Sequence, residues 1–218
     1  MIDPHAGAQL RTAGAPLAGA RGVLILQHGR GGTPEDMLGL AAALALPDLA
    51  CLAPGAIGRT WYPFPFLAPV PQHEPWFSSA LRAVDRTVQH ALHAGQSPRR
   101  IALLGFSQGA CLTLEYAARH SRDYGAVIGL TGGLLGPPGT PWPRPTGLNG
   151  VPVFLSTSDV DPHVPLVRVR ETARVFEAAG AEVTLRVHPG AAHTVIADDV
   201  REVGALLRAR FGAPDTTG

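Results

Sequence analysis

The chain is organised around the stretch Ile101-Ala-Leu-Leu-Gly-Phe-Ser-Gln-Gly-Ala110. Its apolar start predicts a buried strand, and the run Ala110–Glu115 that follows predicts a helix. G-x-S-x-G between a strand and a helix indicates a nucleophile elbow, a strained turn that exposes the serine hydroxyl at the end of a sheet. Residues two positions either side of the serine must be small, because larger side chains would collide with the adjacent strand and helix. Glycine and serine are common residues, so the motif alone is weak evidence for a nucleophile. A histidine and an acid later in the chain, and an oxyanion site earlier in it, would support that interpretation.

The overall composition is typical of a globular enzyme. A chain of 218 residues, 45% hydrophobic and 16% charged, fits a single α/β domain over 1–218 and excludes a disordered protein. The formal charge of +1 and the absence of a long basic run exclude nucleic acid as a partner. All 18 cationic side chains are arginine, so no lysine is present to act as a base. Cys51 and Cys111 lie in apolar runs, which indicates buried free thiols and no disulfide or metal pair.

The start of the chain gives an expectation about location. The first residues lack a basic segment followed by an apolar stretch, as a secretory signal would require. No window approaches the roughly 20 apolar residues of a membrane span. We therefore expect a soluble, cytoplasmic protein without stable membrane insertion, present as a monomer or a homodimer.

Apolar runs alternate with amphipathic segments along the chain. We expect strands over residues 22–27, 50–53, 101–104, 126–130, 151–155 and 182–187, and helices over 34–46, 77–95, 166–179 and 198–210. Residues 1–21 are expected to hold one or two antiparallel edge strands, and 212–218 to form a flexible tail. This alternation predicts an α/β fold with a mostly parallel, doubly wound central sheet flanked by helices.

Two long connections, over residues 54–75 and 131–150, are rich in proline or glycine. Connections of this length in a compact domain are usually functional. We expect an apolar acyl or aryl pocket walled by aromatic side chains of the first connection and two leucines of the second, namely Trp61, Tyr62, Phe64, Phe66, Leu134 and Leu135. The alternative is that these side chains pack on the core or form a dimer contact.

A serine nucleophile needs an imidazole to take its proton and an acid to orient that imidazole. Ser107, Asp161 and His193 follow predicted strands in the order Ser, Asp, His, which is typical of α/β-hydrolases. Asp161 precedes a proline, which favours an extended backbone, and His193 lies in a flexible turn. His188 is the alternative base and Asp159 the alternative acid, although Asp159 fits better as a residue that closes its own loop.

The oxyanion of such a reaction needs two backbone N–H donors. We expect one at Gln108, directly after the nucleophile, and one at Arg30, in the turn after the first buried strand. His28 is expected to support that turn through hydrogen bonds. For the Arg30 side chain two roles remain open: it attracts an anionic substrate group, or it pairs with Glu35 or Asp36.

Four motifs together carry a family resemblance: His28-Gly-Arg-Gly, Gly105-Phe-Ser-Gln-Gly-Ala, Asp161-Pro-His-Val-Pro and Gly190-Ala-Ala-His. Over about residues 22–210 the chain resembles the carboxylesterase, lysophospholipase and acyl-protein thioesterase family of small α/β-hydrolases. One departure concerns the first turn, which in members that deacylate proteins resembles His-Gly-Leu-Gly-Asp. The arginine in this turn makes the chain look more like a bacterial branch acting on small esters.

The resemblance implies an α/β-hydrolase core with little or no separate lid domain and no cofactor. It also implies Ser107, Asp161 and His193 as the triad, with Arg30 and Gln108 as oxyanion donors, hydrolysing small to medium acyl or aryl esters. A thioesterase or lysophospholipase would use the same machinery. A non-catalytic binding protein should have a broken triad, and a metallohydrolase should have closely spaced histidine ligands; neither pattern is found in this sequence.

Overall fold

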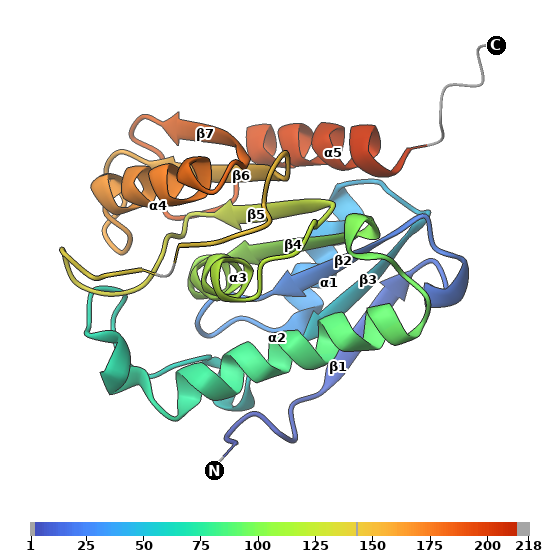
Figure 1. Ribbon diagram of the computed structural model, residues 1–218, viewed down its shortest axis with the longest axis horizontal. Coiled ribbons are helices and arrows are strands. Elements are labelled where there is room, and N and C mark those ends of the chain that lie inside the picture. The colour runs from blue at the N-terminus through green and yellow to red at the C-terminus, as the bar shows by residue number, and fades with distance from the viewer. Residues whose placement is uncertain (1–2, 143, 213–218) are drawn as a thin grey trace.

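The computed structural model describes residues 3–142 and 144–212, which build one seven-stranded sheet (Figure 1). The strand order is β1-β3-β2-β4-β5-β6-β7, and only the edge strand β1 runs antiparallel to its neighbour. The strands are β1 (Leu10–Gly14), β2 (Gly22–Gln27), β3 (Leu49–Pro54), β4 (Ile101–Phe106), β5 (Ala126–Leu130), β6 (Pro152–Ser158) and β7 (Glu182–His188). The α/β-hydrolase class with a mostly parallel sheet is thereby confirmed, and one N-terminal edge strand is found.

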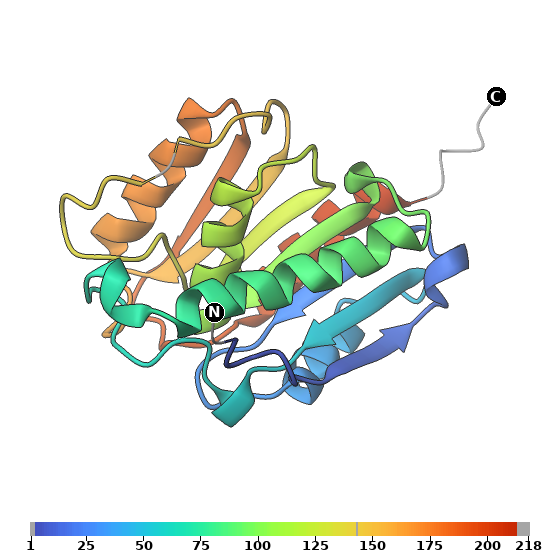
Figure 2. The same cartoon turned by 60° about the horizontal axis from the view of Figure 1, so that its bottom comes forward.

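Helices cover both faces of the sheet, and Figure 2 shows α2, α3 and α4 lying across one of them. The opposite face carries α1 and α5. The helices are α1 (Pro34–Ala43), α2 (Trp76–His93), α3 (Gln108–Arg119), α4 (Leu166–Ala178) and α5 (Ala197–Phe211). This two-sided arrangement explains why the central strands are continuous apolar runs. In β2, Val23 and Ile25 join the core under α2 and α3, whereas Leu24 and Leu26 join the core under α1 and α5.

The start of α1 illustrates how the sequence sets an element. The Thr33 hydroxyl accepts from the Asp36 N–H, and the Asp36 carboxylate accepts from the Thr33 N–H. These two hydrogen bonds form a capping box, and Pro34 occupies the first helical position.

The carboxyl ends of the parallel strands all lie at one edge of the sheet, where the candidate site is built. β2 and β4, which precede the oxyanion turn and the elbow, are direct neighbours. The first long connection contains two short 3-10 helices, Ile57–Arg59 and Val70–His73. The expected tail falls outside the described residues, apart from Gly212. In the part of the chain that the structure describes, no helix has the length and apolar character needed to cross a membrane.

Candidate active site

Ser107 occupies the sharp turn between β4 and α3. Its backbone has φ 53° and ψ −119°, a strained conformation for a residue with a side chain. The flanking glycines are required by close packing of the backbone: a Cβ at Gly105 would lie 2.2 Å from the Gly109 oxygen, and one at Gly109 would lie 2.1 Å from the Gln27 oxygen. The turn can therefore form only with glycine at both positions, as the motif indicated.

The Ser107 hydroxyl lies within hydrogen-bond distance of an imidazole. His193 Nε2 is 2.7 Å from Ser107 Oγ, and His193 Nδ1 is 2.6 Å from Asp161 Oδ2. An ionised carboxylate only accepts hydrogen bonds, so Nδ1 carries the proton and Nε2 is free to accept the serine proton. The structure thus brings Ser107, His193 and Asp161 together in the arrangement of a hydrolytic triad.

Asp161 is held by its own turn. Its Oδ1 accepts from the backbone N–H groups of His163 and Val164, each at 2.8 Å, which leaves Oδ2 for His193. Burial of the carboxyl group acts to raise its pKa, but the hydrogen bonds from His193 and from the two N–H groups outweigh burial and lower the pKa below its ordinary value. The carboxyl group therefore favours its ionised form.

The alternative acid and base lie elsewhere. Asp159 accepts from the Gly190 N–H at 2.7 Å, so it ties the acid loop to the turn that carries His193, and does not close its own loop. His188 Nε2 contacts Asp199 Oδ1 at 2.8 Å, at the start of α5. Neither residue contacts Ser107.

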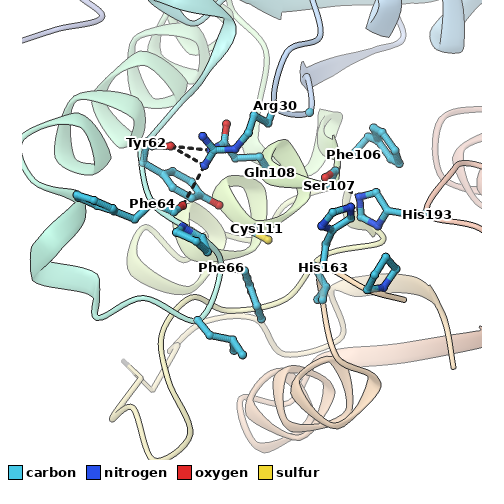
Figure 3. A pocket seen from close by; sticks show the side chains of 15 residues that line it. Arg30, Tyr62, Phe64, Phe66, Phe106, Ser107, Gln108, Cys111, His163 and His193 are labelled. Carbon is cyan, nitrogen blue, oxygen red and sulfur yellow. Dashed lines mark hydrogen bonds between the residues drawn. The ribbon is translucent and has the colours of Figure 1, made fainter. Parts of the chain in front are cut away.

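The His193 ring is packed between two other rings. Phe106 lies 5.6 Å away between ring centroids, and His163 lies 4.8 Å away in an edge-on orientation (Figure 3). These contacts limit how far the imidazole can rotate away from Ser107. Neither residue was predicted from the sequence, although Phe106 directly precedes Ser107 and His163 lies two positions after Asp161.

The two expected oxyanion donors both lie at the cavity. Arg30 and Gln108 are among its lining residues, and neither backbone N–H has an acceptor within the described ranges. His28 supports the turn as expected, since its Nδ1 contacts the Gly29 oxygen and its Nε2 accepts from the Ala56 N–H. Burial lowers the pKa of His28, so Nε2 remains an acceptor.

The Arg30 side chain does not pair with Glu35 or Asp36, one of its two expected roles. Glu35 pairs with Arg11, and Asp36 caps α1. The guanidinium of Arg30 instead donates to backbone carbonyls of the 54–75 connection. The arginine thus serves the protein's own loop, and no carboxylate among residues 3–142 and 144–212 forms an ion pair with it.

A cavity of about 540 Å³ opens beside Ser107, a volume typical of small-molecule sites. Its wall is mainly apolar and comes from the first long connection, the elbow and the acid loop (Figure 3). The residues that line it are Gly29, Arg30, Tyr62, Phe64, Pro65, Phe66, Leu67, Phe106, Ser107, Gln108, Cys111, Pro162, His163, Val164 and His193.

Three of the expected pocket residues do not line this cavity. Trp61 is fully buried, stacks on His28 and donates its indole N–H to the His28 oxygen. Leu134 and Leu135 are also fully buried in the core, and their backbone N–H groups donate to Thr172 and Glu115. For these residues the alternative of core packing is the correct one. Tyr62, Phe64 and Phe66 do line the cavity.

Cys111 is a second potential nucleophile at the cavity wall, and the sequence analysis expected only a buried thiol. It lies in the first turn of α3, which begins directly after Ser107, and both residues line the cavity. Burial raises the pKa of the Cys111 thiol to about 12. The thiol is therefore neutral at ordinary pH and does not compete with the serine.

The chain is similar in sequence and in structure to known proteins. Residues 14–210 match the family described as phospholipase/carboxylesterase. The chain belongs to that family. The match begins at Gly14, the last residue of β1, and ends within α5.

Individual known proteins are also similar to this chain. A phospholipase/carboxylesterase structure from Dyadobacter fermentans is 40% identical, with a TM-score of 0.88, and the match covers 92% of this chain and 96% of that one. Acyl-protein thioesterase 1 of Gibberella zeae is 31% identical over 56% of this chain, and that of Saccharomyces cerevisiae is 27% identical over 61%. The matched segments span only 52% and 59% of those two thioesterases.

Proposed function

We propose that this member of the phospholipase/carboxylesterase family is a serine ester hydrolase that acts through an acyl-enzyme. The observation that carries the proposal is the double contact of His193, which meets Ser107 Oγ with one ring nitrogen and Asp161 with the other. Only an arrangement of this kind lets an imidazole accept a serine proton while an acid stabilises the resulting cation.

The steps follow from these contacts. Ser107 Oγ attacks the ester carbonyl carbon as its proton moves to His193 Nε2, and the carbonyl oxygen becomes an oxyanion that accepts from the N–H groups of Gln108 and Arg30. His193 then gives the proton to the leaving alcohol, and the acyl group stays on Oγ. A water molecule, deprotonated by His193, attacks the acyl-enzyme, and the acid is released while the proton returns to Ser107.

The substrate class we propose is small to medium acyl or aryl esters. A cavity of about 540 Å³ with Phe64, Phe66 and Leu67 in its wall suits an apolar acyl group of modest size. Thioester hydrolysis is the second candidate, favoured by the similarity to the two acyl-protein thioesterases. Both reactions use the same acyl-enzyme, so the leaving group alone separates them.

The test is hydrolysis of p-nitrophenyl esters from acetate to laurate by the wild-type protein and by Ser107→Ala. We expect the alanine variant to lose at least about 10⁴-fold in kcat, because the nucleophile is gone. Activity that survives in Ser107→Ala would refute the serine mechanism. A thioester with the same acyl group, run in parallel, distinguishes the two candidates: a higher kcat/KM for the thioester would favour a thioesterase.

A further inference from the structure

The two residues that we assign as oxyanion donors share a second property, which concerns their side chains. Arg30 and Gln108 lie on separate elements, the turn after β2 and the start of α3, yet both side chains bind the backbone of the same segment, Thr60–Phe64. This segment begins the aromatic wall of the cavity. We refer to it as the strap.

Gln108 holds the first half of the strap. Its side-chain oxygen accepts from the Trp61 N–H at 2.9 Å and from the Thr60 hydroxyl at 3.2 Å, and its Nε2 donates to the Tyr62 oxygen at 2.8 Å. The amide group is buried. Its orientation is therefore fixed by the strap, and so is the start of α3 that presents the Gln108 N–H.

Arg30 holds the second half. Its Nη2 donates to the oxygens of Tyr62 and Phe64, both at 2.9 Å (Figure 3). Its Nη1 donates to the Pro63 oxygen at 3.0 Å. One guanidinium thus binds three successive carbonyls. A planar group with several donors in a fixed geometry is needed for this, and a lysine ammonium has no such geometry.

The turn is also joined to Arg59, the residue directly before the strap. The Gly31 N–H donates to the Arg59 oxygen at 2.7 Å, and the Arg59 side chain donates to the Gly32 oxygen at 3.3 Å. The Tyr62 oxygen accepts from Gln108 and from Arg30 at once. The two donor residues therefore meet at one strap carbonyl, and a displacement of either is transmitted to the other.

We propose that Arg30 is a positioning residue: through the strap, its guanidinium sets the separation of the two oxyanion N–H donors and links that separation to the aromatic acyl wall. This inference rests on the proposed ester hydrolysis. The turn reads His28-Gly-Arg-Gly here, in contrast to the His-Gly-Leu-Gly-Asp pattern of members that deacylate proteins. The proposal gives this arginine a role in the transition state that needs no charge on the substrate.

The expected signature is a loss in kcat that does not depend on acyl length. Acetyl esters are too small to need the wall formed by Phe64 and Phe66, so a variant that only loosens the wall would process acetate normally. A variant that displaces an oxyanion donor loses rate for every ester, because removing one donor costs on the order of 10²–10³ in kcat. Partial displacement should cost at least about tenfold.

The experiment compares Arg30→Lys and Arg30→Met with a control variant, Arg186→Met. Arg186 is an exposed residue of β7 that pairs with Glu202 on α5. Measurements are kcat and KM for p-nitrophenyl acetate and octanoate, and inhibition by 1,1,1-trifluoroacetone, whose adduct with a serine carries an oxyanion. We expect both Arg30 variants to lose at least tenfold in kcat for both esters, with inhibition weakened by a similar factor, while Arg186→Met equals the wild type. Unchanged kcat for acetate in Arg30→Lys would overturn the proposal, as would a loss confined to octanoate KM.

A second measurement separates this inference from the proposed function. Hydrogen exchange of peptides that cover residues 29–32 and 60–66 needs no substrate, and Arg30→Lys should accelerate exchange in both segments. If the wild type hydrolyses no ester, the proposed function fails, and the exchange result still tests the coupling. Faster exchange in 60–66 alone would show that the strap moves without the turn and would overturn the inference.

Discussion

The most direct test of the acid is Asp161→Asn, because its effect can be worked out atom by atom. Oδ1 of Asp161 accepts from two backbone N–H groups, and Oδ2 accepts from His193 Nδ1. An asparagine has one acceptor oxygen, and the two N–H groups will take it. Its NH₂ group must then face Nδ1, which forces His193 to accept there and to carry its proton on Nε2.

With a proton on Nε2, His193 can no longer accept the proton of Ser107. The same tautomer change in a serine protease triad lowers kcat by about 10⁴-fold, which corresponds to about 5.4 kcal/mol in the transition state. We expect a similar loss here, with KM little changed and the circular dichroism spectrum retained. The assay is p-nitrophenyl ester hydrolysis at neutral pH.

Asp159→Asn provides the matched control, since its amide oxygen can still accept from the Gly190 N–H. This variant should keep the wild-type rate. If Asp161→Asn retained more than about a tenth of the wild-type kcat, or if Asp159→Asn lost as much, the assignment of the acid would be wrong.

Three further predictions concern stability and the pocket. Gly109→Ala should destabilise the protein by at least about 3 kcal/mol in urea unfolding, because its Cβ would lie 2.1 Å from a carbonyl oxygen, whereas Gly39→Ala, in open space on α1, should stabilise by about 0.5–1 kcal/mol. Leu134→Ala should cost about 2–5 kcal/mol without moving the acyl-length optimum, and Phe66→Ala should move that optimum with a smaller loss of stability. Burial lowers the pKa of the three histidines His5, His28 and His73. As the pH falls, these histidines take up protons at a higher pH in the unfolded chain than in the folded protein. The free energy of unfolding should therefore be highest above about pH 6.5 and decrease as the pH falls below that value. Equal urea midpoints at pH 7.5 and pH 5.5 would contradict this.

Most of the fold could be predicted because its signals are local. The runs at 22–27 and 126–130 match β2 and β5 residue for residue, since strands covered on both faces are apolar throughout and end where polar or glycine residues begin. The capping box at Thr33 set the start of α1 in the same way. Errors of a few residues occur at helix ends, as in α1, which ends at Ala43 and not near Leu46.

The juxtaposition of Ser107, Asp161 and His193 could also be predicted from the sequence, because the topology brings the strand ends together. The pocket could not. Hydrophobicity shows that Trp61, Leu134 and Leu135 avoid water, but a cavity wall and a core satisfy that need equally well. In the structure these residues also make hydrogen bonds to residues far away in the sequence, which the sequence does not reveal. The Trp61 indole N–H donates to the His28 oxygen, and the Leu135 N–H donates to the Glu115 carboxylate. The position of Cys111 at the cavity wall could have been predicted, because it lies four positions after Ser107 on a predicted helix.

The contacts of the strap bear on how a protein of this kind could change its substrate during evolution. Loops around a conserved core are usually regarded as exchangeable parts, and a new 54–75 segment would be the obvious route to a new acyl preference. Here that segment offers three carbonyls to Arg30 and an N–H and a carbonyl to Gln108. A transplanted loop would have to reproduce this backbone path or arrive together with a new residue at position 30. Sequence changes in the two segments should therefore be inherited as a pair, and a chimaera that exchanges one alone should fold and yet turn over slowly.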